Sequence, residues 1–174
     1  MIAFLLFVFF LMSSDRMVPI EPEGLKNFHV VTPTVYRSGQ PHKKDMKRLE
    51  QIGVKTIINL RNVIDDKQEI KGTSLIQLRI PMRAKKITYE DIVTTMCAIE
   101  TAEKPVLIHC LHGSDRTGCM VAAYQMLSGM KKEEAISQFQ EEQYGYNSRL
   151  FPNILELLES IDPKQLKIDV GSHQ

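Results

Sequence analysis

The chain has 174 residues, of which 43% are hydrophobic and 25% are charged, and its formal net charge is +1. This length suits one domain with a sizeable core, and the composition is that of an ordinary globular protein. Because the charge is nearly balanced, nothing favours a nucleic acid as partner.

The first residues differ from the rest, because residues 2–12 are apolar and uncharged. This run is too short to span a bilayer, which takes about 20 apolar residues, but it has the length of an export-signal core. Ser13 and Ser14 supply small residues for a cleavage site, although no basic stretch precedes the run. We expect a signal peptide or membrane anchor at 1–14, and hence an exported, periplasmic or membrane-anchored protein. The alternatives are a core segment and a cytoplasmic protein. A polar, proline-bearing linker follows at 15–26.

Strand and helix patterns alternate along the remaining chain. Apolar and β-branched runs predict short strands at 28–31, 34–37, 54–60, 75–80 and 106–108. Apolar residues at helical spacing predict helices at 43–52, from residue 88, at 118–127, at 133–142 and at 151–161. Thr88 and Asp91 match an acidic variant of the capping box, which predicts a helix start. We also expect a short acidic helix from Asp65 to Lys71, and we expect Pro81 to end the strand before it.

Alternating strands and helices predict an α/β fold, with a compact, mostly parallel central sheet flanked by helices. The domain is expected to cover residues 27–162, with a polar tail at 163–174. In such sheets, ligands bind beyond the carboxyl ends of the strands.

The segment that follows the strand at 106–108 is the most informative one: it reads His109-Cys110-Leu111-His112-Gly113-Ser114-Asp115-Arg116-Thr117. A strand, a tight loop and a helix start form a pocket for an anion, because loop N–H groups converge and the helix dipole adds positive potential. We expect the loop residues 111–114 to hold a phosphate, which Arg116 closes with two parallel hydrogen bonds.

Cys110 at the base of this pocket is a candidate nucleophile. The field that favours an anion also favours its thiolate, which can attack a bound phosphorus atom and pass the phosphoryl group to water. Thr117 can steady the departing thiolate, and His109 is expected to support the loop. Gly113 and Gly118 allow close backbone approach.

Other interpretations of the loop remain open. A buried cysteine and a surface arginine can share a strand–helix turn without function, and a rhodanese-like sulfur transferase also uses a cysteine in a short anion loop. His109, Cys110, His112 and Cys119 contain metal-ligating atoms, but their spacing matches no common zinc pattern. Cys97 and Cys119 read as small core residues, and the alternative for Cys119 is a reversible disulfide with Cys110 under oxidation.

Three arginines lie at or beyond the carboxyl ends of predicted strands, which is the ligand-binding edge: Arg37, Arg61 and Arg83. Each of these arginines, taken alone, is also compatible with an ordinary solvent-exposed residue. Together they indicate a basic rim that suits a phosphorylated substrate.

Residues 28–41, the strand end at 58–61 and the loop at 109–118 together resemble the cysteine-dependent dual-specificity and protein-tyrosine phosphatases, in particular their bacterial, exported TpbA-like branch. The plant and fungal atypical dual-specificity group is similar. The resemblance covers about residues 27–160. It implies the compact phosphatase fold, no metal or other cofactor, and hydrolysis of phosphorylated protein. A phosphoinositide or inositol phosphate is the alternative substrate, and a phosphate-binding module with little turnover is the second alternative.

One part of the family pattern is missing. These enzymes place an aspartate general acid on the loop after the strand at 75–80, but here residues 81–88 contain no carboxylate and Lys85 stands near the expected position. Asp115 then becomes the first candidate acid, since it resembles the arrangement in myotubularin-like and some bacterial lipid phosphatases. A general acid contributes about 10²–10⁴-fold to the rate. The alternative is that Asp115 only pairs with a neighbouring Arg or Lys.

Overall fold

The computed structural model describes residues 24–173. The expected signal or anchor at 1–14 and the linker up to residue 23 lie outside this part. A five-stranded sheet forms the centre, in the order β1-β2-β5-β3-β4. Its strands are β1 (His29–Thr32), β2 (Val35–Ser38), β3 (Thr56–Arg61), β4 (Ile76–Met82) and β5 (Val106–His109). Only the β1–β2 pair is antiparallel, which confirms the mostly parallel sheet.

The register of the parallel strands brings three polar residues to one edge of the sheet. His109 at the end of β5 lies between Ser38 of β2 and Asn59 of β3. All three side chains are fully buried, so each needs polar partners nearby. This edge is where the predicted ligand-binding loop starts.

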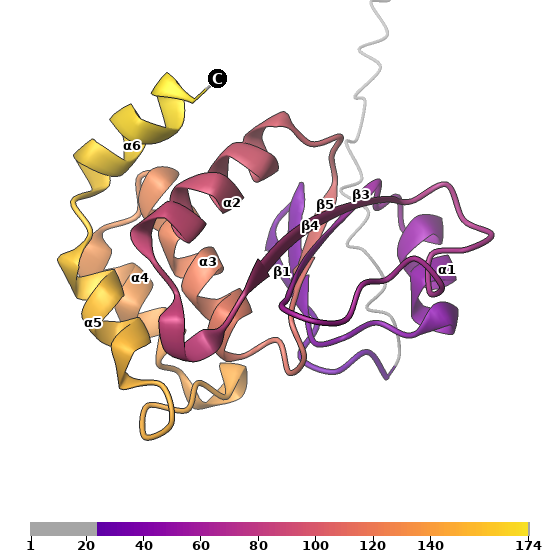
Figure 1. Ribbon diagram of the computed structural model, residues 1–174, viewed down its shortest axis with the longest axis horizontal. Coiled ribbons are helices and arrows are strands. Elements are labelled where there is room, and N and C mark those ends of the chain that lie inside the picture. Colours follow the sequence, from indigo (N-terminus) through magenta and orange to yellow (C-terminus); the bar gives the residue numbers. More distant parts are fainter. Residues whose placement is uncertain (1–23, 174) are drawn as a thin grey trace, which may run out of the picture.

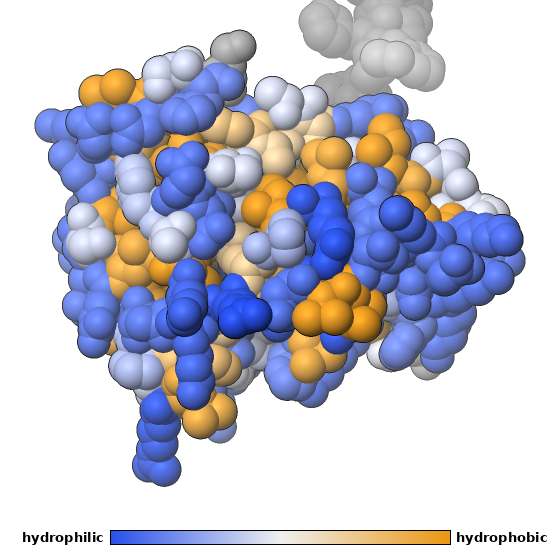
Figure 2. Space-filling view, viewed as in Figure 1, coloured by the Kyte–Doolittle hydropathy of each residue, from blue (hydrophilic) through white to orange (hydrophobic). Residues whose placement is uncertain are grey.

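Six helices cover the sheet in the described part of the chain: α1 (Lys43–Gln51), α2 (Tyr89–Thr101), α3 (Asp115–Leu127), α4 (Lys132–Phe139), α5 (Pro152–Ser160) and α6 (Pro163–Ser172). Two short 3-10 turns, η1 (Ala84–Lys86) and η2 (Glu142–Tyr144), complete the elements. Figure 1 shows α1 on one side of the sheet and the other five helices on the opposite side. Their outer surfaces are mainly hydrophilic, with apolar patches in between (Figure 2).

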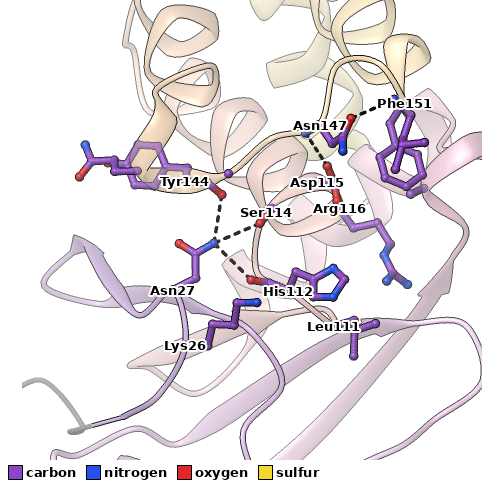
Figure 3. Close-up of a pocket in the computed structure, with 14 residues that line it drawn as sticks. Lys26, Asn27, Leu111, His112, Ser114, Asp115, Arg116, Tyr144, Asn147 and Phe151 are labelled. Carbon is purple, nitrogen blue, oxygen red and sulfur yellow. Dashed lines mark hydrogen bonds between the residues drawn. The ribbon is translucent and has the colours of Figure 1, made fainter.

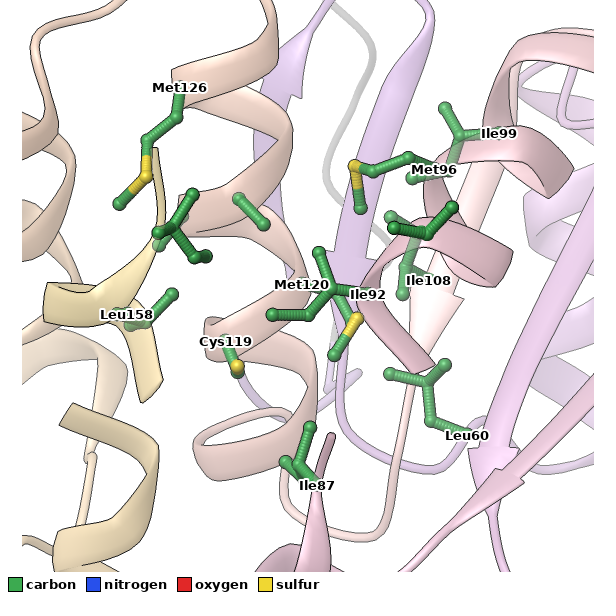
Figure 4. Packing of buried hydrophobic residues seen from close by; sticks show 14 of the residues in the cluster. Leu60, Ile87, Ile92, Met96, Ile99, Ile108, Cys119, Met120, Met126 and Leu158 are labelled. Carbon is green, nitrogen blue, oxygen red and sulfur yellow. The ribbon is translucent and has the colours of Figure 1, made fainter. Parts of the chain in front are cut away.

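The strands divide their apolar side chains between two cores, because successive residues of a strand point to opposite faces. Ile57 and Leu107 pack with Met46 of α1 in the smaller core. Ile58 and Ile108 belong to the larger core, where Figure 4 shows Met96 and Ile92 of α2 facing Met120 of α3. The cores hold the ends of β3 and β5 in fixed positions beneath the loop.

The predicted cap of α2 is present. Thr88 Oγ1 accepts the Asp91 N–H at 3.2 Å, and Asp91 Oδ2 accepts the Thr88 N–H at 2.9 Å. The Asp91 carboxylate therefore caps the start of α2.

Two predictions between β3 and α2 were wrong. Residues 65–71 form irregular structure and turns instead of a helix, because Asp66 is drawn inward to bind the buried Asn59 and His109 and the half-buried Gln40. Pro81 does not end β4, which continues to Met82. A proline is tolerated there because β4 is an edge strand, and the β3–β4 register shifts in this region.

The C-terminal prediction was also wrong, because the expected polar tail forms α6. Asp162 caps this helix by accepting the Lys164 N–H at 2.9 Å. Leu166 and Val170 are buried in the larger core, and the Tyr89 hydroxyl donates to Asp169 at 2.8 Å. The helix predicted at 133–142 ends at Phe139 and is followed by η2. Within residues 24–173, no helix is long and apolar enough to cross a bilayer.

Candidate active site

The loop between β5 and α3 has the geometry expected of an anion pocket. Cys110 is only 2% exposed, and its Sγ accepts the Gly113 N–H at 3.3 Å. α3 begins at Asp115, so the positive end of its dipole adjoins the loop. A backbone donor and a helix terminus therefore surround the thiol of Cys110.

The loop lies directly against the segment after β2. Gly113 has a φ of +77°, and a Cβ added to it would stand 2.6 Å from the carbonyl carbon of Ser38 and from the nitrogen of Gly39. Gln40 donates its N–H to the Leu111 carbonyl at 3.1 Å. At Gly118, an added Cβ would stand 2.8 Å from the ring of Phe139. Gly113 therefore allows the close approach of two backbone segments, whereas Gly118 leaves room for the Phe139 side chain.

A cleft of about 680 Å³ opens above the loop. Figure 3 shows Asn27 between the loop and the opposite wall of this cleft. Its Nδ2 lies 3.0 Å from the Tyr144 carbonyl, 3.2 Å from the His112 carbonyl and 3.3 Å from Ser114 Oγ. Asn27 thus ties together three segments that are distant in sequence, and no sequence pattern had singled it out.

Arg116 lies at the carboxyl ends of β3 and β4, where its Nη1 donates to the carbonyls of Leu60 at 3.4 Å and Met82 at 3.3 Å. It lines the main cleft and also a neighbouring one of about 380 Å³. The neighbouring cleft is basic, since its lining includes Arg83, Lys85 and Lys86.

Asp115 is the one carboxylate among the described residues that line the main cleft. Its side chain is largely buried, and Oδ1 accepts the Asn147 N–H at 3.0 Å. In Figure 3, it points toward Asn147, whereas the guanidinium of Arg116 points away from it. Among residues 24–173, Asp115 forms no ion pair with an Arg or Lys, so the pairing considered as its alternative role is not present.

Arg37 does not lie on a substrate rim, contrary to the sequence prediction. It is 2% exposed, donates from Nη2 to the Gly113 carbonyl at 2.7 Å, and places Cζ 4.4 Å from the ring centre of Tyr144. Burial lowers the pKa of Arg37 to about 10, although the charges of Tyr144 and Cys110 oppose this shift. The guanidinium therefore remains a cation at neutral pH, beneath the loop.

The other two predicted rim arginines differ in position. Arg61 is half-buried and donates from Nη1 to Gln40 Oε1 at 2.9 Å, so it is part of the packing beside the loop. Arg83 is exposed and lines the basic cleft, and its role on a substrate rim stays a prediction.

His109 lies beneath the loop, and it has a partner that the sequence analysis missed. Nδ1 lies 3.1 Å from the Cys110 carbonyl, and Nε2 lies 2.8 Å from Oδ2 of the buried Asp66. Burial raises the pKa of Asp66, but hydrogen bonds and the charge of His109 outweigh this and hold the pKa below its usual value. Asn59 was the available signal, because an amide inside an apolar strand needs a buried partner.

The Thr117 hydroxyl is buried and makes no hydrogen bond to the described residues, including Cys110. Its role with the departing thiolate stays a prediction. The thiols of Cys97, Cys110 and Cys119 are free, and burial raises the pKa of Cys119, which makes it a poor partner for thiol exchange. Within residues 24–173, no group of three or more His, Cys, Asp or Glu side chains is placed to hold a metal ion.

Comparisons with known proteins agree on one family. Residues 31–130 match the model described as "Polymorphic toxin system, DSP-PTPase phosphatase". The chain is 29% identical over 123 residues to the dual specificity protein phosphatase TpbA of Pseudomonas aeruginosa, a match that covers 68% of this chain and 56% of the relative. It is 26% identical over 144 residues to the inositol diphosphatase DSP5 of Arabidopsis thaliana, covering 74% of this chain and 66% of that one.

The fold is similar to that of solved phosphatases. The crystal structure of P. aeruginosa TpbA matches with a TM-score of 0.77 and 25% identity, over 84% of this chain and 91% of that one. A cysteine-to-serine variant of TpbA in complex with pTyr matches with a TM-score of 0.78 and 23% identity, over 90% and 98% of the two chains.

Proposed function

The chain belongs to the family of DSP-PTPase phosphatases of polymorphic toxin systems, and we propose that it hydrolyses phosphoric monoesters, above all phosphotyrosine in proteins. The observation that carries the proposal is the Cys110 thiol at the base of a loop formed by the Gly113 N–H, the start of α3 and Arg116. Leu111, Leu150 and Phe151 line the cleft and give it apolar walls that suit an aromatic ring.

In the first step, the Cys110 thiolate attacks phosphorus while the bond from phosphorus to the substrate oxygen breaks. The loop N–H groups and Arg116 stabilise the charge on the three non-reacting oxygens. Asp115, in its acid form, gives its proton to the departing oxygen. The products are the free alcohol or phenol and a cysteinyl phosphate.

In the second step, water attacks phosphorus and the bond from phosphorus to sulfur breaks. The Asp115 carboxylate takes the proton of the water, and the thiolate leaves to restore the starting state. Inorganic phosphate is the second product. Thr117 is the group proposed to steady the thiolate at this point.

The direct test replaces the nucleophile. Cys110→Ser is expected to abolish hydrolysis of para-nitrophenyl phosphate, because a serine hydroxyl is not ionised at neutral pH. Cys97→Ser is the matched control, since Cys97 lies in α2 and donates to the Val170 carbonyl, away from the cleft. Activity retained in Cys110→Ser would exclude the cysteinyl-phosphate mechanism.

A second candidate substrate is an inositol phosphate or phosphoinositide. The basic cleft favours it, because Arg83, Lys85 and Lys86 lie beside Arg116 and could hold further phosphates of the same molecule. Phosphate release from phosphopeptides, inositol polyphosphates and phosphoinositide vesicles separates the two substrate classes. Binding of these compounds without turnover would instead indicate a phosphate-binding module.

For localisation, we propose that residues 1–14 take the protein out of the cytoplasm, as a cleaved signal or as a membrane anchor. The support is the uncharged run at 2–12 and the small residues Ser13 and Ser14. N-terminal sequencing of the protein from fractionated cells is the test. An uncleaved chain in the cytosol would contradict both forms of the proposal.

A further inference from the structure

Asp66 is the centre of a buried polar cluster beneath the catalytic loop, and the chemistry proposed above does not use it. Its carboxylate is fully buried and lies near three nitrogen donors. Gln40 Nε2 is 2.7 Å from Oδ1, and Asn59 Nδ2 and His109 Nε2 are each 2.8 Å from Oδ2. The cluster joins the segment after β2, the ends of β3 and β5, and the turns at 65–71.

The orientations of the two amides are fixed by partners outside the cluster. Asn59 Oδ1 accepts the Arg61 N–H at 2.7 Å, so the amide nitrogen of Asn59 must face Asp66. Gln40 Oε1 accepts from the Arg61 guanidinium at 2.9 Å, so its nitrogen must face Asp66 as well. Both carboxylate oxygens of Asp66 therefore accept N–H groups, which is the pattern of an ionised carboxylate.

His109 is then left with an acceptor at each ring nitrogen. Nδ1 faces the Cys110 carbonyl at 3.1 Å, and Nε2 faces the Asp66 carboxylate at 2.8 Å. A neutral imidazole carries one N–H and can satisfy only one of them, whereas an imidazolium satisfies both. A buried imidazolium needs a counter-ion, and Asp66 is the carboxylate in contact with it.

We propose that Asp66 is a positioning residue for the nucleophile, and that it holds His109 as an imidazolium under Cys110. In this form, the Nδ1–H fixes the Cys110 carbonyl, and a full positive charge lies behind the residue that must carry a thiolate. The role rests on the proposed phosphatase function, but its physical basis, the protonation of His109, is independent of any substrate.

Substitution of Asp66 by Asn should disturb this arrangement, although the two side chains have the same shape. The amide nitrogen would have to replace one of the two oxygens, and each oxygen now accepts an N–H. Every orientation of the new amide therefore places an NH₂ group against a donor. His109 also loses the counter-ion that balances its charge.

The first measurement uses the unaltered protein. ¹⁵N NMR of histidine-labelled protein at neutral pH should show two protonated ring nitrogens for His109. One protonated and one unprotonated nitrogen would overturn the proposal, whether or not any variant folds. Loss of the His109 signals in His109→Asn assigns them.

The second measurement compares Asp66→Asn with Asp65→Asn. Asp65 is the neighbour in sequence and in charge, but its carboxylate interacts with Lys67 and not with the buried cluster, so this control should behave as the unaltered protein. Alkylation of Cys110 by iodoacetamide is expected to be about 10- to 100-fold slower in Asp66→Asn, the range for loss of a charged hydrogen bond. Turnover of para-nitrophenyl phosphate should fall similarly in kcat with little change in KM.

The outcomes separate the two proposals. Equal alkylation rates in the two folded variants would overturn the role of Asp66. A protein that hydrolyses no phosphate ester, yet shows the His109 imidazolium and the slower alkylation, would contradict the proposed function and leave the positioning role of Asp66 intact.

Discussion

Two regions around the loop are built in opposite ways: the residues beneath it, here called the floor, and the exposed residues around the two clefts, here called the mouth. The floor (Arg37, Ser38, Gln40, Asp66 and His109) is buried except for the half-buried Gln40, and its side chains are held by hydrogen bonds of 2.7–3.1 Å. The mouth (Leu111, Leu150, Arg83, Lys85 and Lys86) is exposed and belongs to loops and a 3-10 turn. Under the proposed function, the buried floor holds the reaction geometry, whereas the exposed mouth, whose residues have few internal contacts, selects the substrate.

The largest effect on stability and activity is expected from Gly113→Ala, because Gly113 contacts the floor. The new Cβ would stand 2.6 Å from backbone atoms of Ser38 and Gly39 at a φ of +77°, so the loop must move. We expect a loss of about 2–4 kcal/mol in the free energy of unfolding and no measurable hydrolysis. Urea denaturation and an aryl phosphate assay measure the two effects.

Gly72→Ala is the matched control for this prediction. Gly72 also has a positive φ, +88°, but an added Cβ would meet nothing within 4 Å. It should cost only about 1 kcal/mol. Equal losses in the two variants would show that backbone conformation alone, and not the close contact with the floor, sets the effect at Gly113.

The next effect concerns Asp115, which lies between floor and mouth. Asp115→Asn removes the proton donor and is expected to slow a substrate with a poor leaving group by about 10²–10⁴-fold. A good leaving group such as para-nitrophenolate needs less protonation and should lose much less rate. Ratios of kcat/KM for a series of aryl phosphates give the answer, and equal losses across the series would assign Asp115 a structural role.

The smallest effect is expected at the mouth. Replacement of both Lys85 and Lys86 by Ala should raise KM for an inositol polyphosphate about fivefold at low salt, with less change at high salt and none in kcat. Replacement of Lys164 and Lys167, two exposed lysines of α6, is the control. A fall in kcat with unchanged KM would mean that the mouth, like the floor, sets reaction geometry.

Sequence reasoning predicted the parts of the molecule that local patterns determine. The spacing from Cys110 to Arg116, the strand before it and the helix after it identified the loop, and Thr88 with Asp91 identified the start of α2. These features depend on neighbours in the chain, so their signals are contained in short segments.

The parts that were missed depend on distant partners. The acidic residues around Asp66 favoured a helix, but buried hydrogen bonds to Asn59 and His109 determine the turns there. Arg37 stands at the end of the predicted strand, where an arginine is usually exposed, yet Tyr144 and Gly113, which are remote in sequence, contact it where it is buried. α6 was missed because its few apolar residues contact a core built by other segments.

The position of Asn27 beside the loop has a consequence for where the enzyme can act. Lys26 and Asn27 line the cleft, and residues 13–25 connect them to the apolar run that ends at Met12. An extended chain covers about 3.3–3.6 Å per residue, so this connection reaches at most about 50 Å. If the run stays in a bilayer, the cleft is tethered within roughly that distance of the lipid surface. Cleavage after Ser14 would release the same cleft to diffuse, so that N-terminal processing would set its working radius.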